Sequence, residues 1–363
     1  MLLSSLNILH VRNLCTVSLD CDSAANAFYG DNGSGKTSFL EAIYILGRGR
    51  SFRNRDSKLI VKTGENELLV SGTVMTDKSV AAGRLGVKRT VKGKFEARHN
   101  GANVRSASQL AARLPLQLVD AHSFLLLEGG PVKRRQFVDW GVFHVEHSYF
   151  GIWRRMQRAL KQRNELLRHE RPDGEELSVW TKEFISSSEA IVTFRDRYLA
   201  ELEKELAIIS GHFDGLGCLS LEHYKGWGRN NDLSDVLAAD RNRDLSAGKT
   251  HHGAHRADLI VRINEALATE RLSRGQLKRL VYILKLAQAS LYKKKTAESC
   301  VFLLDDLPAE LDFRHRRQVI ECLNELSCQY FMTGVDKNDF DGLLKEKAHH
   351  VFHVEQGKIS MEC

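Results

Sequence analysis

Residues 30–37 read Gly-Asp-Asn-Gly-Ser-Gly-Lys-Thr, and this stretch decides the fold. It follows a short apolar segment, residues 26–29, and precedes residues 36–46, whose apolar side chains recur at helical spacing. Gly47 stands where a helix would be capped. The order is therefore strand, glycine-rich loop, helix, which is the setting that the pattern G-x-x-x-x-G-K-[ST] needs to form a phosphate-binding loop.

In such a loop, successive backbone N–H groups and the helix N-terminus point at the phosphates of a bound nucleotide. Lys36 is expected to reach the β- and γ-phosphates, and the Thr37 hydroxyl to ligate Mg²⁺. ATP and Mg²⁺ are therefore the predicted cofactors. The predicted nucleotide-binding residues are Gly30, Asp31, Asn32, Gly33, Ser34, Gly35, Lys36, Thr37 and Ser38.

A second motif, residues 301–306, is an apolar strand that ends in two carboxylates. Asp305 is predicted to ligate Mg²⁺ and Asp306 to polarise the attacking water, so that both act in catalysis with Lys36. Many ATPases with this motif have Glu at the second position, and Asp is shorter by about 1.5 Å, one carbon–carbon bond. Slow turnover is the expected consequence.

A third motif, Leu272-Ser273-Arg274-Gly275-Gln276, precedes those carboxylates and opens a helix. It resembles the signature motif of ABC-type ATPases, and residues 308–312 resemble their D-loop. Taken alone, the string is also typical of a capped helix start with Ser273 as the N-cap.

The rest of the chain divides into segments that differ in their pattern of apolar and polar residues. Residues 58–104 alternate apolar and polar side chains, and Asn100-Gly101 predicts a two-residue hairpin, so an antiparallel β-layer is expected there. After Pro131, helices are predicted over about 132–169 and 177–209 with a turn at 171–174, whereas 210–256 are interpreted as loops. The expected fold class is α/β, a P-loop ABC-type ATPase head with an antiparallel β-layer and an inserted, mainly helical second lobe.

Composition narrows the classes of protein. The 363 residues are 42% hydrophobic and 27% charged, which is typical of globular chains that form two or three compact units. No uninterrupted apolar run is long enough for a membrane span, and the N-terminus lacks the pattern of a signal peptide. Seven cysteines without a Cys-x-x-Cys pair argue against a disulfide framework or zinc ribbon, and a cytoplasmic location is expected.

Charge suggests a polyanionic partner. Lys and Arg number 53 against 46 Asp and Glu, a net charge of +7, and the excess is concentrated in residues 84–113 and 131–171. Such segments predict DNA contacts, although solvated surface faces would look the same. The DNA candidates are Arg84, Lys88, Arg89, Lys92, Lys94 and Arg98. A further cluster, Arg48, Arg50, Arg53 and Arg55, fits DNA, adenine or phosphate equally well.

Three other features of the sequence either allow two interpretations or argue against a type of site. Gln117 fits either a Q-loop ligand of Mg²⁺ or a plain strand-end glutamine. Residues 331–334 contain no switch histidine of the transporter type. His251, His252 and His255 have no cysteine partners, so a zinc site is not expected.

Together the motifs resemble the RecF family of DNA repair ATPases over nearly the whole chain. The matching blocks are GDNGSGKTSFLEAIYILGRGRSFR, EGGPVKRRQFVDWGVFH, LKQRNELLR, GAHRADL, LSRGQLK and LLDDLPAELD. Ala254, Pro308 and Ala309 depart from the family pattern and put the rate of hydrolysis in doubt more than nucleotide binding. An ATPase lobe of residues 1–118 and 277–363 and a helical lobe of residues 119–276 are expected.

The resemblance implies an ATP-dependent protein that binds single-strand gaps and their junctions with duplex DNA, and that helps RecO and RecR load RecA recombinase. It also implies an ATP-dependent homodimer, in which Ser273, Arg274, Gly275 and Gln276 of one subunit cap the nucleotide of another. A DNA clamp with negligible hydrolysis needs the same motifs. A transporter-type cassette is disfavoured because it would carry a switch histidine and little net charge.

Overall fold

The computed structural model describes residues 1–14, 16–54, 56–76, 83–169, 173–344 and 349–362. The chain forms two compact units, unit 1 with residues 1–123 and 278–363 and unit 2 with residues 124–277. None of the described helices combines the length and apolar character that a membrane crossing requires.

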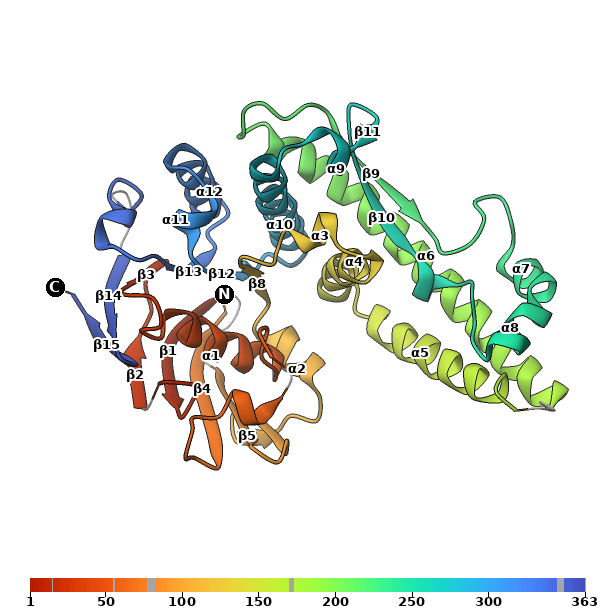
Figure 1. Ribbon diagram of the computed structural model, residues 1–363, viewed down its shortest axis with the longest axis horizontal. Helices are drawn as coiled ribbons and strands as arrows, with labels where there is room; N and C mark the ends of the chain where they lie inside the picture. Colours follow the sequence, from red (N-terminus) through yellow and green to blue (C-terminus); the bar gives the residue numbers. More distant parts are fainter. Residues whose placement is uncertain (15, 55, 77–82, 170–172, 345–348, 363) are drawn as a thin grey trace. The chain divides into compact units, whose positions relative to one another are not determined.

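Unit 1 contains a mixed sheet in the order β15-β14-β3-β13-β12-β8 (Figure 1). Strands β14, β3, β13, β12 and β8 run parallel, and β15 pairs antiparallel with β14. The strands span β3 (Ala25–Tyr29), β8 (Leu116–Val119), β12 (Val301–Leu304), β13 (Gln329–Thr333), β14 (His349–Glu355) and β15 (Lys358–Met361). Because helices and loops cover both faces, the central strands β12 and β13 are buried along their whole length, as continuous apolar strands require.

The second sheet of unit 1 is antiparallel, in the order β2-β1-β4-β5-β6-β7. Its strands are β1 (Leu2–Leu9), β2 (Thr16–Asp20), β4 (Glu67–Met75), β5 (Gly83–Thr90), β6 (Phe95–His99) and β7 (Ala102–Asn103). The predicted hairpin is confirmed, since His99 pairs with Ala102 and leaves Asn100 and Gly101 as the turn, both at positive φ. The expected antiparallel layer is therefore present.

Helix α1 (Lys36–Arg48) packs against strands of both sheets. Its apolar side chains join residues from β1, β3, β4 and β13 in one hydrophobic core, which includes Ile8, Phe28, Phe39 and Phe331. A helix with one solvent face would bury one stripe only, whereas most residues of α1 are buried. The remaining elements of unit 1 are α2 (Ala107–Arg113), α11 (Leu307–Glu310), α12 (Phe313–Glu325), most of α10 (Arg274–Thr296), η1 (Ser57–Leu59) and η3 (Lys337–Phe340).

Unit 2 is mainly helical, and α5 (Tyr149–Leu166) lies beside the long helix α6 (Gly174–Ser210) (Figure 1). The Asp173 side chain caps α6 by accepting from the backbone N–H groups of Glu175 and Glu176. A three-stranded sheet in the order β11-β10-β9 completes the unit. Its other elements are α3 (Leu125–Glu128), α4 (Pro131–Val145), α7 (Leu233–Ala239), α8 (Arg241–Ala247), α9 (Ala268–Arg271), η2 (Ala254–Arg256), β9 (Leu219–Tyr224), β10 (Asp258–Ile263) and β11 (Ala266–Leu267).

Two expectations about unit 2 were wrong. The helix predicted over about 132–169 is interrupted at residues 146–148, between α4 and α5. Residues 210–256, interpreted as loops, contain β9, α7 and α8. Leu233 and Leu237 are buried one helical turn apart, a spacing too short to stand out beside the Gly- and Asn-rich flanks.

A hydrogen-bonded cluster around the buried Arg195 joins four elements of unit 2. The Arg195 side chain is 2% exposed. Its Nε donates to Asp139 Oδ1 at 2.9 Å, and its Nη1 donates to the Ala254 carbonyl at 2.8 Å. Asp139 also accepts from the Tyr149 hydroxyl at 2.6 Å. Helices α4, α5 and α6 and the turn η2 therefore share one hydrogen-bonded cluster.

Replacing Arg195→Ala is expected to lower the free energy of unfolding by about 3–5 kcal/mol, because it leaves the Asp139 carboxylate without its cation. Arg197→Ala on the same helix is the matched control, since that side chain is 62% exposed, and a change within about 0.5 kcal/mol is expected. Urea unfolding followed by circular dichroism measures both. Equal stability of the two variants would contradict the assignment.

Candidate functional site

The glycine-rich loop follows β3 and ends at the first residue of α1. Gly30 has φ +147°, and a Cβ there would lie 2.1 Å from the Val354 carbonyl oxygen. Gly35 has φ +124°, and a Cβ there would crowd Asn13 at 3.1 Å. Side chains are excluded at these two positions by both backbone conformation and space, so the loop can keep its tight curl around a phosphate-sized ligand.

Lys36 lies along this loop. Its Nζ donates to the Gly30 carbonyl at 2.5 Å and to the Asp31 carbonyl at 2.9 Å. Burial lowers the pKa of Lys36, an effect opposed by the nearby carboxylates of Asp306 and Asp305. The ammonium group is therefore held at the loop by neutral carbonyls, which a more negative phosphate can replace as partners.

Asp305, at the carboxyl end of β12, meets the start of α1. Its Oδ1 accepts from the Thr37 hydroxyl at 3.0 Å and from the Thr333 hydroxyl at 2.9 Å. The Thr333 hydroxyl in turn accepts from the Asp306 backbone N–H at 2.7 Å. Burial raises the pKa of Asp305, and the hydroxyls of Thr333 and Thr37 offset part of that rise.

Thr333 is a site residue that sequence reasoning missed. From the sequence, the one inference about residues 331–334 was that they contain no switch histidine. In the structure, Thr333 ends β13, which lies between β3 and β12, so its side chain reaches the same edge as Thr37 and Asp305. The signal available in the sequence was a polar residue that ends a buried strand.

A cavity of about 750 Å³ opens at this edge. It is lined by Arg12, Asn13, Asn32, Gly33, Gly35, Lys36, Thr37, Ser38, Arg53, Lys58, Leu59, Val61, Lys62, Thr63, Asp305, Asp306 and Thr333. Lysine and arginine side chains in this wall outnumber the two aspartates, which suits a polyanionic ligand such as a nucleoside triphosphate. Gly30, Asp31 and Ser34, which were predicted to bind nucleotide, belong to the loop but not to the cavity wall.

Asn13 ties the end of the first hairpin to the phosphate loop. Its Nδ2 donates to the carbonyls of Gly33 and Ser34 at 3.2 and 3.1 Å, and its Oδ1 accepts from the Ser38 hydroxyl at 2.8 Å. The Ser38 hydroxyl, predicted to bind nucleotide, is thus engaged by Asn13. No local motif around residues 12 and 13 indicated this role, because the contacts depend on tertiary pairing.

The oxygen atoms of Thr37 and Asp305 fit Mg²⁺. A hydroxyl and a carboxylate are the hard donors this ion prefers, together with water and phosphate oxygens. The raised pKa of Asp305 marks a carboxylate whose charge is poorly compensated by the protein itself. A bound cation at these two oxygens would supply the missing compensation and neutralise phosphate charge.

The structure favours one of the two interpretations of Gln117, that of a plain strand glutamine. Gln117 lies within β8, is 3% exposed and is not part of the cavity wall. Its Nε2 donates to Gln288 Oε1 at 3.1 Å, and its Oε1 accepts from Lys285 at 3.3 Å. The amide is occupied by α10, which agrees with the alternative of a structural strand glutamine.

The third motif forms the N-terminus of α10 as a capping box. The Ser273 backbone N–H donates to Gln276 Oε1 at 2.9 Å, and the Gln276 backbone N–H donates to Ser273 Oγ at 3.4 Å. Ser273, Arg274 and Gly275 are exposed. The capped helix start is therefore real, and the same residues are accessible to a second molecule.

The predicted DNA residues on the antiparallel sheet differ in their surroundings. Lys88 pairs with Glu67 and Lys94 with Glu96, each at 2.7 Å. The Arg89 guanidinium donates to the Gly49 carbonyl at 3.3 Å, and burial lowers its pKa. Arg89 is thus engaged by the protein in this structure, and its role as a DNA contact stays a prediction. The exposed members of the predicted set are Arg84, Lys92, Lys94 and Arg98.

Some side chains of the second basic segment, residues 131–171, form ion pairs within the protein. Arg134 pairs with Asp258 at 2.7 Å, and the buried Arg163 pairs with Asp244 at 2.8 Å. Of the cluster at residues 48–55, Arg53 lines the cavity, and Arg55 lies outside the described residues.

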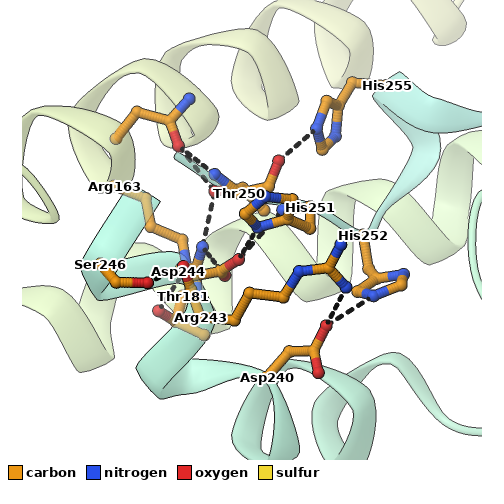
Figure 2. Close-up of polar contacts among 11 residues, drawn as sticks. Arg163, Thr181, Asp240, Arg243, Asp244, Ser246, Thr250, His251, His252 and His255 are labelled. Carbon is orange, nitrogen blue, oxygen red and sulfur yellow. Dashed lines mark hydrogen bonds and ion pairs between the residues drawn. The ribbon is translucent and has the colours of Figure 1, made fainter. Parts of the chain in front are cut away.

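The histidines near residue 250 belong to a hydrogen-bonded cluster in unit 2 (Figure 2). Asp244 accepts from Arg163 and pairs with His251 at 2.8 Å, while His252 pairs with Asp240 at 2.8 Å. Burial lowers the pKa of His255 to about 4, so this ring is neutral at pH 7. Among the described residues no group of three histidine, cysteine or acidic side chains is placed to hold a metal.

Asp305→Asn is expected to stabilise the ligand-free chain, because an aspartate whose folded pKa is raised makes folding less favourable as pH rises through its unfolded pKa. The same change should abolish the extra thermal stabilisation that Mg²⁺ gives in the presence of ATP. Differential scanning calorimetry at pH 7, with and without ATP and Mg²⁺, checks both effects. A variant that melts lower than the intact chain and keeps the Mg²⁺ effect would contradict this role.

The chain is similar in sequence to known proteins over nearly its whole length. A family model described as the RecF/RecN/SMC N terminal domain matches residues 2–360. The DNA replication and repair protein RecF of Pseudomonas paraeruginosa (strain DSM 24068 / PA7) is 43% identical over 361 residues, covering 99% of this chain and 98% of that protein. The RecF of Cellvibrio japonicus (strain Ueda107) is 41% identical over 363 residues, with 99% of each chain covered.

The fold also matches solved structures. A structure described as the recombination mediator protein RecF-ATP in the RecFOR pathway has a TM-score of 0.89 at 24% identity, covering 100% of this chain and 98% of that one. An SMC head bound to the C-winged helix domain of ScpA has a TM-score of 0.59 at 12% identity, with 100% and 97% covered. The expected ATPase-head fold is therefore confirmed. By sequence and fold together, the chain belongs to the RecF family of the RecF/RecN/SMC proteins.

Proposed function

We propose that this chain is an ATP-dependent DNA-binding protein of recombinational repair and replication, with a slow ATPase that times its release. The observation that carries the proposal is the contact of Thr37 with Asp305 beside Lys36, in a cavity whose wall includes five basic side chains and two aspartates. This arrangement suits a triphosphate with its magnesium ion. Membership in the RecF family supports DNA as the second ligand.

Hydrolysis requires a group that orients water beside the terminal phosphate, and Asp306 is our candidate. Its backbone is held by Thr333, and its side chain lines the cavity. Burial raises the pKa of Asp306, and Lys36 opposes that rise. A short carboxylate in this position favours slow turnover, which suits a switch better than a motor.

Dimerisation is proposed to depend on ATP. Ser273 and the first turn of α10 are exposed and carry the positive end of a 23-residue helix, which favours a phosphate ligand. We infer that this end binds the γ-phosphate of the nucleotide held by a second copy of the chain. ATP would then be part of the subunit interface.

DNA is proposed to bind through exposed basic side chains that are free to meet phosphates. On the antiparallel sheet, Arg84, Lys92 and Arg98 fit this description. On α5 the exposed residues Arg154, Arg155 and Arg158 lie on one helical face, because their spacing is three and four residues. Their contacts are weak or surface-exposed: Arg155 pairs with Glu183, and Arg158 stacks on the Trp180 ring at 5.6 Å.

Recognition of single-strand gaps and duplex junctions, and the loading of RecA with RecO and RecR, complete the proposed function. The support for these partners is the family of the chain and the described pathway of the solved RecF relative.

Sedimentation velocity tests the ATP switch on labelled gapped DNA. The intact chain with ATP and Mg²⁺ is expected to sediment on DNA as a dimer. Lys36→Met is expected to lose ATP binding and dimerisation together. Ser273→Arg is expected to bind ATP as a monomer but not to dimerise, because the larger, positively charged arginine side chain blocks the helix end. Equal dimer content with and without ATP would overturn this part of the proposal.

The α5 surface is tested by the triple variant Arg154→Ala, Arg155→Ala and Arg158→Ala. If these side chains contact phosphates, the slope of log affinity against log salt should become shallower by roughly 2–3, about one per lost contact. Lys204→Ala, Arg229→Ala and Arg241→Ala remove three exposed charges elsewhere in unit 2 and form the matched control. An identical slope for the two triple variants would exclude α5 as a specific DNA surface.

A further inference from the structure

Glu41 is an acidic residue whose side chain is fully buried in unit 1. It lies on α1 three residues after Ser38, so both side chains project from the same face of the helix. Glu41 is not part of the cavity wall. A carboxylate in such a place is strongly unfavourable unless cations and hydrogen-bond donors surround it, so its partners explain its presence.

Its first partner is Arg12, which forms a two-point contact. Arg12 Nε donates to Glu41 Oε2 at 2.8 Å, and Arg12 Nη2 donates to Glu41 Oε1 at 2.9 Å. This paired geometry fixes the plane of the guanidinium group. It leaves Nη1 of Arg12 for another ligand, and Arg12 lines the phosphate cavity.

Its second set of partners lies in the loop after α1. The Ser51 hydroxyl donates to Glu41 Oε1, and the same hydroxyl oxygen accepts from the backbone N–H groups of Arg53 and Asn54, each at 3.0 Å. Arg53 Nη1 lies 4.0 Å from Glu41 Oε2, and this side chain is 48% exposed and lines the cavity. Glu41 thus holds the loop that carries a second arginine.

The Arg12 segment is also held by residues 60 and 61, which follow the loop after α1 in the chain. The Arg12 backbone N–H donates to the Ile60 carbonyl at 2.8 Å, and the neighbouring residues Val11 and Val61 form an isolated antiparallel bridge. Arg12 has φ +56°, a strained backbone conformation for arginine that persists only where its surroundings hold it. Glu41 thus lies outside the cavity wall but contacts two side chains that line it, those of Arg12 and Arg53.

We propose that Glu41 is a positioning residue, which orients Arg12 and Arg53 so that their guanidinium groups bind the phosphates of the nucleotide. The inference rests on the proposed nucleotide site and adds residues that the G-x-x-x-x-G-K-[ST] pattern does not contain. Because two hydrogen bonds to Glu41 already order the Arg12 guanidinium group, little conformational entropy of that side chain is lost when the nucleotide binds. Glu41 acts through these arginines and does not contact the nucleotide.

The test measures binding of a fluorescent ATP analogue by Glu41→Gln, in which the amide places a donor against a donor of Arg12. The analogue is expected to bind about tenfold more weakly. A double-mutant cycle then combines this change with Arg12→Ala and Arg53→Ala. In that background Glu41→Gln should cost less than about twofold, because its targets are gone.

A purely structural role would lower the melting temperature and reduce affinity equally in both backgrounds. Equal losses, or unchanged affinity in folded Glu41→Gln, would overturn the proposal. If Glu41→Gln does not fold, Arg12→Met with Glu41→Leu replaces the ion pair by an apolar pair, which buried sites often tolerate. That folded variant should also bind about tenfold more weakly or worse, and affinity equal to that of the intact chain would refute the role.

Lys36→Met separates failure of this inference from failure of the proposed site. If Lys36→Met binds the analogue as well as the intact chain does, the cavity is not the nucleotide site and both proposals fall. If Lys36→Met loses binding while the Glu41 variants retain it, only the positioning role of Glu41 is wrong.

Discussion

The meeting of Thr37 and Asp305 at one edge of the parallel sheet is the constraint on which the rest of unit 1 depends. The two residues are 268 positions apart in the chain, and a single hydrogen bond of 3.0 Å joins them. The strand order β3-β13-β12 makes this possible, because parallel strands present their carboxyl ends at the same edge. The polar side chains of Asp305 and Thr333, at the ends of two buried apolar strands, thus lie together at that edge.

The positive wall of the cavity has a different origin from the phosphate loop. Arg12 and Arg53 come from segments outside the parallel sheet, and the buried carboxylate of Glu41 attaches both to α1. In the proposed site the helix has two tasks: its N-terminus would bind the phosphates, and its buried Glu41 would orient cations beside them. This double role explains why α1 is enclosed by two sheets and has little surface of its own.

Much of this could be predicted from the sequence, because the signals are local. The phosphate loop, the apolar strand before Asp305 and the hairpin at Asn100 each depend on a few adjacent residues. The roles of Thr333 and Glu41 could not be predicted in this way, since they arise from pairing between distant segments. Two interpretations of Gln117 stayed open for a related reason: its residue type suits a metal ligand, but only the packing of α10 shows where its amide points.

The number and position of basic residues could be predicted from the sequence, but not which of them form contacts within the protein. The sequence locates the basic segments correctly, yet Arg89, Arg134 and Arg163 are engaged within the protein, and only the folded structure separates them from exposed neighbours such as Arg154. Pairing of this kind needs acidic partners that lie far away in the chain. A count of charges therefore indicates a polyanionic ligand without locating its surface.

The most direct measurement is a calorimetric titration of ATP into the intact chain and into Thr37→Val, with and without Mg²⁺. The account predicts one ATP per chain and tighter binding with Mg²⁺, and it predicts that Thr37→Val loses the benefit of Mg²⁺ because the hydroxyl ligand is gone. Binding of the same strength with and without Mg²⁺, or a full Mg²⁺ effect in Thr37→Val, would contradict the site described above.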